Sequence, residues 1–247
     1  MEFLAEVQGA AFWTGLLTIV WVNIILSGDN AVVIALAARS LPPGQQKKAV
    51  AWGAGAAVVL RIVLTIGAVA LLKWPYLKII GGLALFWIAI GLLIPEDGGD
   101  GVNGSDNLFQ AIKTILIADL VMSVDNVIAV AAAAKGSIVL LVLGLGISIP
   151  LVIFGATLLM RLMERYPIII TAGAGILGWV AGEMLVTDPA LVGWINMNLP
   201  WMNMHTPVGE VAWAQFVGVV IVIGAGKWLA SRKQAGEETT VEIPRDG

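Results

Sequence analysis

The chain has 247 residues, of which 59% are hydrophobic and only 13% are charged, and its formal net charge at pH 7 is −3. This apolar share far exceeds that of a soluble domain, so the sequence predicts an integral membrane protein that is embedded in the lipid bilayer. The absence of cysteine excludes disulfides and thiolate metal sites. The negative net charge argues against nucleic acid as a partner.

Seven apolar runs approach or exceed the roughly 20 residues that a helix needs to cross a bilayer. None shows the alternation of a membrane barrel strand. We therefore predict an all-α protein, residues 1–247, that forms a single transmembrane domain with seven transmembrane helices. The predicted spans are residues 12–38, 49–72, 77–94, 108–134, 136–160, 168–187 and 211–230.

The distribution of the 14 Lys and Arg residues predicts the orientation of the chain. If the amino terminus lies outside, ten of them fall on the cytoplasmic side, three fall outside, and Arg61 lies within a span. Because cytoplasmic loops carry the excess of basic residues, we expect the amino terminus to lie outside and the carboxyl terminus inside.

A polar phrase occurs twice inside apolar runs and indicates an internal repeat. Residues 27–30 read S-G-D-N and residues 123–126 read S-V-D-N, and the same offset of 96 residues places Asn23 opposite Asp119. The G-A-G of residues 53–55 similarly matches the G-L-G of residues 144–146. Three spans separate one phrase from its copy, so the two repeats have opposite orientations in the membrane, an arrangement that places a substrate site at their interface.

This repeat divides the chain into predicted segments. Residues 12–94 form the first three-helix repeat and residues 108–187 the second, joined by an acidic cytoplasmic loop at 95–107. An outer loop at 188–210, a seventh helix at 211–230 that supports the repeats from outside, and a disordered cytoplasmic tail at 231–247 follow.

The repeated phrases contain the candidate binding residues. A charged side chain in hydrocarbon costs roughly 2.5–3.5 kcal/mol on insertion scales, so carboxylates in these spans indicate a function. On an ideal helix the Asp of each S-x-D-N phrase lies about 120° from the stripe formed by the other polar residues. Either the helix is interrupted, with Gly28 allowing an unwound turn, or both helices are regular and each Asp faces the opposite repeat. The candidate ligands are Asp29, Asp119, Asp125, Asn30, Asn126, Ser27, Ser123 and Asn23.

Only oxygen donors occur in this set, which suits Mg²⁺, Ca²⁺ or Mn²⁺ better than Zn²⁺ or Cu⁺. The alternative is that these polar groups only hold helices together by hydrogen bonds. Arg61 is a candidate counter-ion for an aspartate, with a structural bridge or snorkelling as the alternative. Glu183 is a candidate vestibule carboxylate, with a place at the water boundary as the alternative.

The paired S-G-D-N-A and S-V-D-N-V phrases in a seven-span chain resemble the TerC family, which is named for tellurium resistance and is related in fold to the LysE transporter superfamily. The resemblance covers nearly all of residues 12–230. It implies a bacterial inner (plasma) membrane protein that exports manganese, with the acidic motif residues carried over onto Asp29, Asp119 and Asp125 and with Asn30 and Asn126 beside them.

We therefore expect a secondary transporter that exports a hard divalent cation, foremost Mn²⁺, from the cytoplasm, with proton exchange or sodium exchange as the coupling. The alternative is a non-transporting membrane partner that supports secretion or metal and tellurite stress resistance. No nucleophile and base pair or nucleotide-binding motif occurs, so we expect neither an enzyme nor a cofactor. The oligomeric state stays open, a homodimer being one option.

Overall fold

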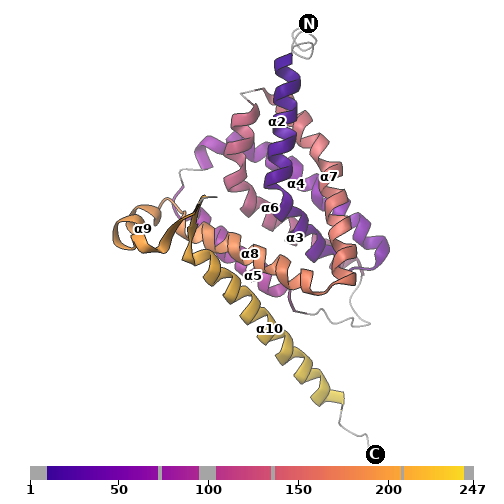
Figure 1. Ribbon diagram of the computed structural model, residues 1–247. Coiled ribbons are helices and arrows are strands. Elements are labelled where there is room, and N and C mark those ends of the chain that lie inside the picture. Colours follow the sequence, from indigo (N-terminus) through magenta and orange to yellow (C-terminus); the bar gives the residue numbers. More distant parts are fainter. Residues whose placement is uncertain (1–9, 72–73, 95–103, 135–136, 207–208, 242–247) are drawn as a thin grey trace, which may run out of the picture.

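The computed structural model describes residues 10–71, 74–94, 104–134, 137–206 and 209–241. At residues 10–11, 68–71, 104–106, 125, 128, 202–206, 209–211 and 236–241 it describes the backbone alone. The helices are α2 (Ala10–Leu26), α3 (Gly28–Ala38), α4 (Pro43–Leu71), α5 (Leu77–Gly91), α6 (Gly104–Ala134), α7 (Ile138–Arg165), α8 (Ile168–Val186), α9 (Val192–Asn198) and α10 (Trp213–Val241) (Figure 1).

Five helices of the described chain are long and apolar enough to cross a membrane, namely α4, α6, α7, α8 and α10. Helices α2 and α3 pass the same test as a pair, although they are bent by 51° at the break between them. Helix α5 is apolar but has only 15 residues, which gives a length of about 22 Å. The multi-pass membrane prediction is confirmed, whereas a seventh full span is not, because α5 is shorter than the roughly 30 Å hydrocarbon core.

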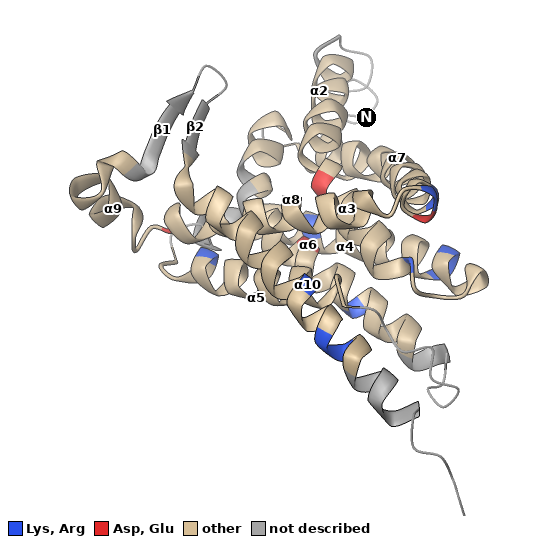
Figure 2. Ribbon diagram, turned by 60° about the horizontal axis from the view of Figure 1, so that its bottom comes forward, with Lys and Arg blue, Asp and Glu red and all other residues tan. Residues whose placement is uncertain are grey.

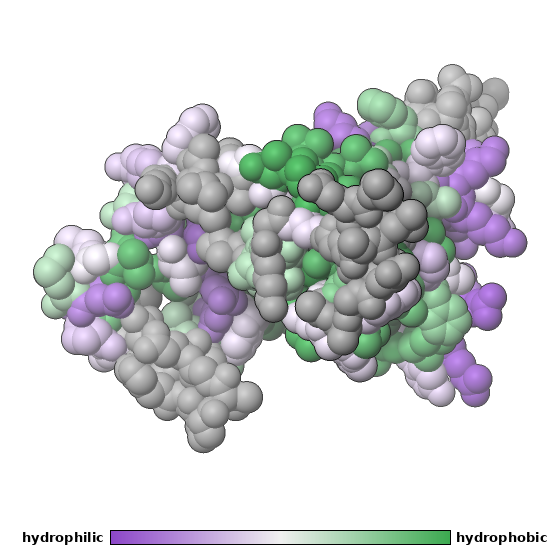
Figure 3. Space-filling model, turned by 90° about the horizontal axis from the view of Figure 1, so that it is seen from above, coloured by the Kyte–Doolittle hydropathy of each residue, from purple (hydrophilic) through white to green (hydrophobic). Residues whose placement is uncertain are grey.

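The molecular surface fits this membrane assignment. Large apolar side chains point outward from several helices, including Trp21 of α2, Trp87 of α5, Phe154 of α7 and Val220 of α10. Figure 3 shows hydrophobic residues gathered in the centre of one face and hydrophilic residues mainly toward its two sides. In Figure 2 most of the Lys and Arg segments lie on the side where α7 and α10 end, away from α9.

The helices pair in a pattern that the two repeats share. Helix α2 packs against α7, and α4 packs against α6, so the first helix of each repeat contacts the second helix of the other. The third helices, α5 and α8, pack against each other, and α10 packs on both. This pattern is the one expected from a repeat, although opposite orientation in the membrane stays a prediction.

Two glycines in equivalent positions make this crossed packing close. A Cβ atom at Gly53 of α4 would lie 2.8 Å from Cδ1 of Ile115 on α6, and a Cβ at Gly144 of α7 would collide with Ile19 of α2. Ile19 and Ile115 are separated by the same 96 residues as the polar phrases. The second glycine of each G-x-G, Gly55 or Gly146, has no such neighbour. The sequence repeat is therefore also a repeat of contacts.

Helix α10 docks on α8 through small residues. A Cβ atom at Gly178 of α8 would lie 2.6 Å from the carbonyl oxygen of Gly218 on α10, and one at Gly182 would collide with the carbonyl oxygen of Ala214. Both helices therefore present small residues four apart, a spacing that brings membrane helices into backbone contact. The support role predicted for the last helix agrees with this packing.

Several predicted boundaries need correction. Helix α4 begins at Pro43, because proline is favourable in the first turn, where its missing N–H is not needed. Helix α6 begins at Gly104, inside the predicted acidic loop, and residues 95–103 of that loop lie outside the described chain. Helix α7 continues to Arg165. The predicted disordered tail is helical as far as Val241, where Lys, Gln, Ala and Glu favour helix.

The predicted outer loop contains ordered structure that an all-α prediction misses. After α9 and the 3-10 turn η1 (Pro200–Met202), strands β1 (Asn203–Thr206) and β2 (Gly209–Ala212) pair antiparallel, with Asn203 opposite Ala212. At the start of this segment Asp188, which is fully buried, caps the distant helix α5. Its Oδ1 accepts the N–H of Tyr76 at 3.0 Å, and its Oδ2 accepts the N–H groups of Lys78 and Ile79.

This cap explains where α5 begins. Tyr76 has a left-handed backbone with φ of 69°, and its own side chain caps nothing. Burial raises the pKa of Asp188, but the backbone N–H groups that it accepts lower it, so the pKa lies below its ordinary value of 3.8. Asp188 thus ties the third helix of one repeat to the segment that follows the third helix of the other.

Candidate functional site

The first polar phrase lies at a break in the membrane helix. Helix α2 ends at Leu26, Ser27 adopts a non-helical turn with φ of −109° and ψ of 5°, and α3 starts at Gly28. Ser and Gly in sequence are a known cause of sharp helix kinks. The second phrase, by contrast, lies inside the uninterrupted helix α6. Of the two arrangements left open by the sequence, the break therefore occurs in one copy only.

The break changes two hydrogen bonds and leaves the next one in place. The backbone N–H of Asn30 donates to the Asp29 carboxylate at 2.8 Å instead of to the carbonyl of Leu26. That carbonyl accepts the side-chain amide Nδ2 of Asn126, from α6, at 3.1 Å. The N–H of Ala31 still donates to the carbonyl of Ser27. One asparagine of the second phrase therefore stabilises the break in the first.

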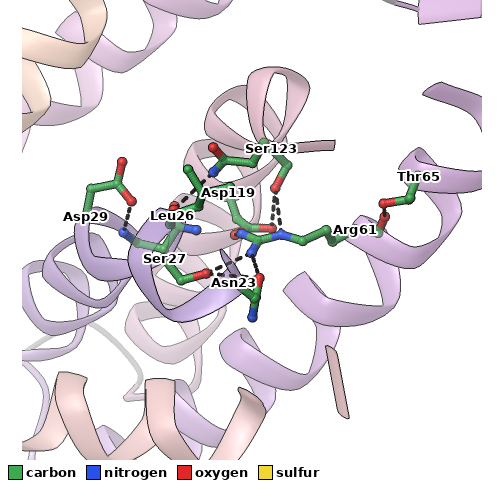
Figure 4. A network of polar contacts seen from close by, with 10 residues as sticks. Asn23, Leu26, Ser27, Asp29, Arg61, Thr65, Asp119 and Ser123 are labelled. Carbon is green, nitrogen blue, oxygen red and sulfur yellow. Dashed lines mark hydrogen bonds and ion pairs between the residues drawn. The ribbon is translucent and has the colours of Figure 1, made fainter. Parts of the chain in front are cut away.

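Arg61 of α4 connects the two phrases. Its Nη2 donates to Oδ1 of Asp119 at 2.6 Å, and its Nε donates to Oγ of Ser123 at 3.1 Å. Its Nη1 donates to Oδ1 of Asn23 at 2.6 Å and to Oγ of Ser27 at 2.8 Å. Figure 4 shows the guanidinium reaching from α4 between these four side chains. We refer to Asn23, Ser27, Arg61, Asp119 and Ser123 as the Arg61 cluster.

The Arg61 cluster is buried and internally satisfied. Its five residues are between 0 and 5% exposed. Within each phrase the serine also donates to the residue four positions earlier, Ser27 to Asn23 and Ser123 to Asp119, both at 3.2 Å. Arg61 and Asp119 form an ion pair with opposite charges. A buried charge is tolerated when it is paired and hydrogen-bonded in this way, so the cluster is closed in the described state.

The side-chain amide of Asn30 differs from the cluster because it has no hydrogen-bond partner among the described residues. Asn30 is 4% exposed, and neither its Oδ1 nor its Nδ2 finds a hydrogen bond within the described side chains. It lines two small cavities beside Asp119, of about 20 Å³ and about 10 Å³. The larger is about the size of one water molecule or one dehydrated ion. An unsatisfied amide facing such a cavity costs free energy, so the position is suited to a ligand.

The other predicted site residues lie elsewhere. Asp29 is partly exposed at the first turn of α3 and points away from the Arg61 cluster (Figure 4). The Asp125 side chain lies outside the described part of the structure, so its predicted approach to Asp29 stays a prediction. Glu183 is exposed on α8, a position that both the vestibule and the water-boundary interpretations allow. No group of three or more His, Cys, Asp or Glu side chains that could hold a metal occurs among the described residues.

Sequence reasoning left the role of Arg61 open and missed one contributor. Thr65 donates from Oγ1 to the carbonyl of Arg61 at 2.7 Å, one turn further along α4. A threonine one turn after a membrane-embedded arginine was the available signal. Sequence spacing alone placed Asn23 opposite Asp119, and the structure brings this pair together through Arg61.

The model of the integral membrane protein TerC family matches residues 8–234 of the chain. The chain belongs to the TerC family. Among curated proteins, this TerC protein is 46% identical over 176 residues to the uncharacterized membrane protein YjbE of Bacillus subtilis, an alignment that covers 71% of the chain and 81% of YjbE. It is 28% identical over 170 residues to the uncharacterized membrane protein YceF of Bacillus subtilis, covering 65% of the chain and 66% of YceF.

A third relative is longer than this TerC protein. The UPF0053 inner membrane protein YoaE of Escherichia coli is 27% identical over 268 residues, covering 98% of the chain and 47% of YoaE. The TerC chain therefore spans about half the length of YoaE. No solved structure matches it. These comparisons support a multi-pass membrane protein whose relatives include inner membrane proteins.

Proposed function

We propose that this TerC protein is a secondary transporter that exports a hard divalent cation, foremost Mn²⁺, from the cytoplasm. The observation that carries the proposal is the buried Arg61 cluster beside the Asn30 side-chain amide, which has no hydrogen-bond partner within the described part of the chain. The two copies of the polar phrase meet there. A scaffold has little reason to bear a buried ion pair and an unsatisfied amide at a helix break.

The donors around the small cavities fit such a substrate. Asp119 offers a carboxylate, and Asn30, Asn23 and Ser27 offer neutral oxygens that line the same 20 Å³ cavity. Hard divalent cations prefer oxygen ligands of this kind. A single carboxylate does not neutralise a divalent ion, so Asp29 and Asp125 remain the candidates for the missing charge when the site opens.

Arg61 occupies the position of a cation in the closed state. Its guanidinium neutralises the Asp119 carboxylate and donates hydrogen bonds to the neutral oxygens of three neighbouring side chains. A metal ion that binds Asp119 therefore competes with Arg61 for the same oxygen atoms. In the absence of metal, Arg61 thereby keeps the buried Asp119 carboxylate from being an unpaired charge. Metal entry displaces Arg61, and metal release allows it to return.

Alternating access to the two sides of the membrane follows from the difference between the two phrases, since the helix is broken at the first and continuous at the second. Leu26 and Met122 are equivalent under the 96-residue offset. The Leu26 carbonyl, freed by the break, accepts the Asn126 amide, whereas the Met122 carbonyl is used inside continuous α6 by the Asn126 N–H. The Asn30 amide consequently lacks its equivalent acceptor. In the state open to the other side of the membrane, we expect α6 to break at Ser123 and Val124. The Met122 carbonyl is then free to accept a hydrogen bond from the Asn30 amide.

Export needs an energy source. Moving a divalent cation out of a cell costs about 4.6 kcal/mol per 100 mV, twice the value for one charge. The chain has no nucleotide-binding loop of the G-x-x-x-x-G-K-[ST] type. We propose proton exchange, in which carboxylates released by the metal take up protons. Sodium exchange is the competing coupling, and an imposed pH gradient at fixed voltage distinguishes the two.

Direct binding tests the substrate assignment. Mn²⁺ is paramagnetic, so its free concentration is followed by electron paramagnetic resonance while purified protein is added. We expect saturable Mn²⁺ binding that Mg²⁺ or Ca²⁺ competes for and that Asp119→Asn weakens at least tenfold, with Glu183→Gln as the matched control. Equal binding by wild type and Asp119→Asn would contradict the site. A protein that binds and moves no metal would instead be a membrane partner.

A further inference from the structure

A further cavity, larger than the two beside Asp119, lies where α3, α5 and α6 come together. Its volume is about 190 Å³, which holds about six water molecules. Its polar lining consists of Ser40, Asn107, Gln110 and Thr114. Ser40, Asn107 and Gln110 are exposed and Thr114 is half-buried, so the cavity leads inward from the surface.

The surroundings of this cavity favour a cation. Helices α3 and α5 both end here, and Ala37 and Gly91 from their last turns line it. Helix C-termini carry partial negative charge. Arg39 already responds to that charge, because its Nη2 donates at 2.9 Å to the carbonyl of Leu92, another lining residue. The neutral oxygens of the lining suit contact with the water shell of an ion rather than direct ligation.

The cavity is aligned with the Arg61 cluster along two helices. On α6, Thr114 precedes Asp119 by five residues, about 7.5 Å along the axis. On α3, Ala37 and Asn30 lie two turns apart on one face. Between this cavity and the Arg61 cluster lie Val33, Ile34 and Ile115, which are 1 to 3% exposed. They line the cavity of about 10 Å³ together with Asn30 and Asp119. These three apolar side chains close the route.

We propose that the 190 Å³ cavity is a waiting site for the hydrated divalent cation and that Val33, Ile34 and Ile115 form the gate between it and Asp119. The inference rests on the proposed transport function. Ile115 is the part of the gate that senses helix movement, because it packs against Gly53 of α4, the helix that carries Arg61. A shift of α4 that withdraws Arg61 from Asp119 also releases Ile115.

Thiol labelling tests the waiting site, since the chain contains no cysteine. Thr114→Cys and the neighbouring control Lys113→Cys, which is exposed but does not line the cavity, are reacted with a positively charged, membrane-impermeant methanethiosulfonate. We expect millimolar Mn²⁺ to slow labelling at Thr114→Cys at least threefold and to leave the Lys113→Cys rate unchanged. A negatively charged reagent of equal size should react more slowly at Thr114→Cys alone.

Shortening the gate tests the second half of the proposal. Ile115→Ala should increase passive Mn²⁺ leak into proteoliposomes severalfold, whereas Leu120→Ala, on the outer side of the same helix, should not. If wild type takes up Mn²⁺ but Mn²⁺ gives no protection at Thr114→Cys, or Ile115→Ala leaks no more than Leu120→Ala, the waiting site or the gate is wrong and transport still stands. If wild type takes up no Mn²⁺, both proposals fail.

Discussion

Nη2 of Arg61 lies 2.6 Å from Oδ1 of Asp119, with both side chains buried where α4 crosses α6. Removing one partner of a buried pair leaves an uncompensated charge, at a cost of about 3–5 kcal/mol. We therefore expect Asp119→Asn to be strongly destabilised in thermal unfolding of the purified protein. The substitution therefore changes stability as well as charge, because Asp119 is paired with Arg61.

The double variant Arg61→Gln with Asp119→Asn separates stability from function. Because neither charge remains, most of the stability should return, while Mn²⁺ binding should not. If the double variant is no more stable than Asp119→Asn alone, the ion pair is not what holds α4 to α6.

The two equivalent asparagines predict opposite effects on stability. Asn30→Leu removes a buried amide without a described partner and should raise the free energy of unfolding. Asn126→Leu removes a bond to the Leu26 carbonyl and should lower the free energy of unfolding by about 1 kcal/mol. Both should slow transport, because each side chain stabilises one of the two states. If Asn30→Leu transports at the wild-type rate, the proposal that the helix break moves from the end of α2 to α6 during transport is wrong.

The glycine pairs supply a test of the repeat with built-in controls. Gly53→Ala and Gly144→Ala place a methyl group against Ile115 and Ile19, and overpacking of this kind costs about 1–3 kcal/mol. Gly55→Ala and Gly146→Ala meet open space and should be neutral or slightly stabilising, since alanine favours helix. Unfolding temperatures of the four variants should fall into these two classes, and any other grouping argues against the crossed packing.

Asp188 predicts a specific pH dependence of stability. Because its pKa in the folded protein lies below the ordinary value of 3.8, its contribution is present above that value and is lost as pH falls through the folded pKa. Asp188→Asn should cost about 1–2 kcal/mol near neutral pH, the range for loss of a helix cap. The difference in free energy of unfolding between wild type and Asp188→Asn should become smaller below pH 4. A difference that becomes larger there would contradict the role of Asp188 as a cap. Glu183→Gln, an exposed carboxylate, is the control.

The doubled phrase predicted much of the site because a constant offset places chemically equivalent residues at one interface. Asn23, Ser27, Asp119 and Ser123 meet as that logic requires. Helical periodicity could not decide whether the helix breaks, since the two copies differ at the position where the first has Gly28 and the second has Val124. The cap by Asp188 involves residues about 110 positions apart and leaves no local pattern. The strand pair after α9 is equally invisible because its segments are only four residues long.

The central claim is tested most directly by Mn²⁺ uptake into inside-out membrane vesicles that contain wild type, Asp119→Asn, Asp29→Asn, Asp125→Asn or Glu183→Gln. We predict uptake by wild type that is driven by an imposed pH gradient and accompanied by opposite proton movement, strong loss in the three aspartate variants, and a mild effect of Glu183→Gln. Uptake by Asp119→Asn at the wild-type rate, or no uptake of any hard divalent cation by wild type, would contradict a transport site at the Arg61 cluster.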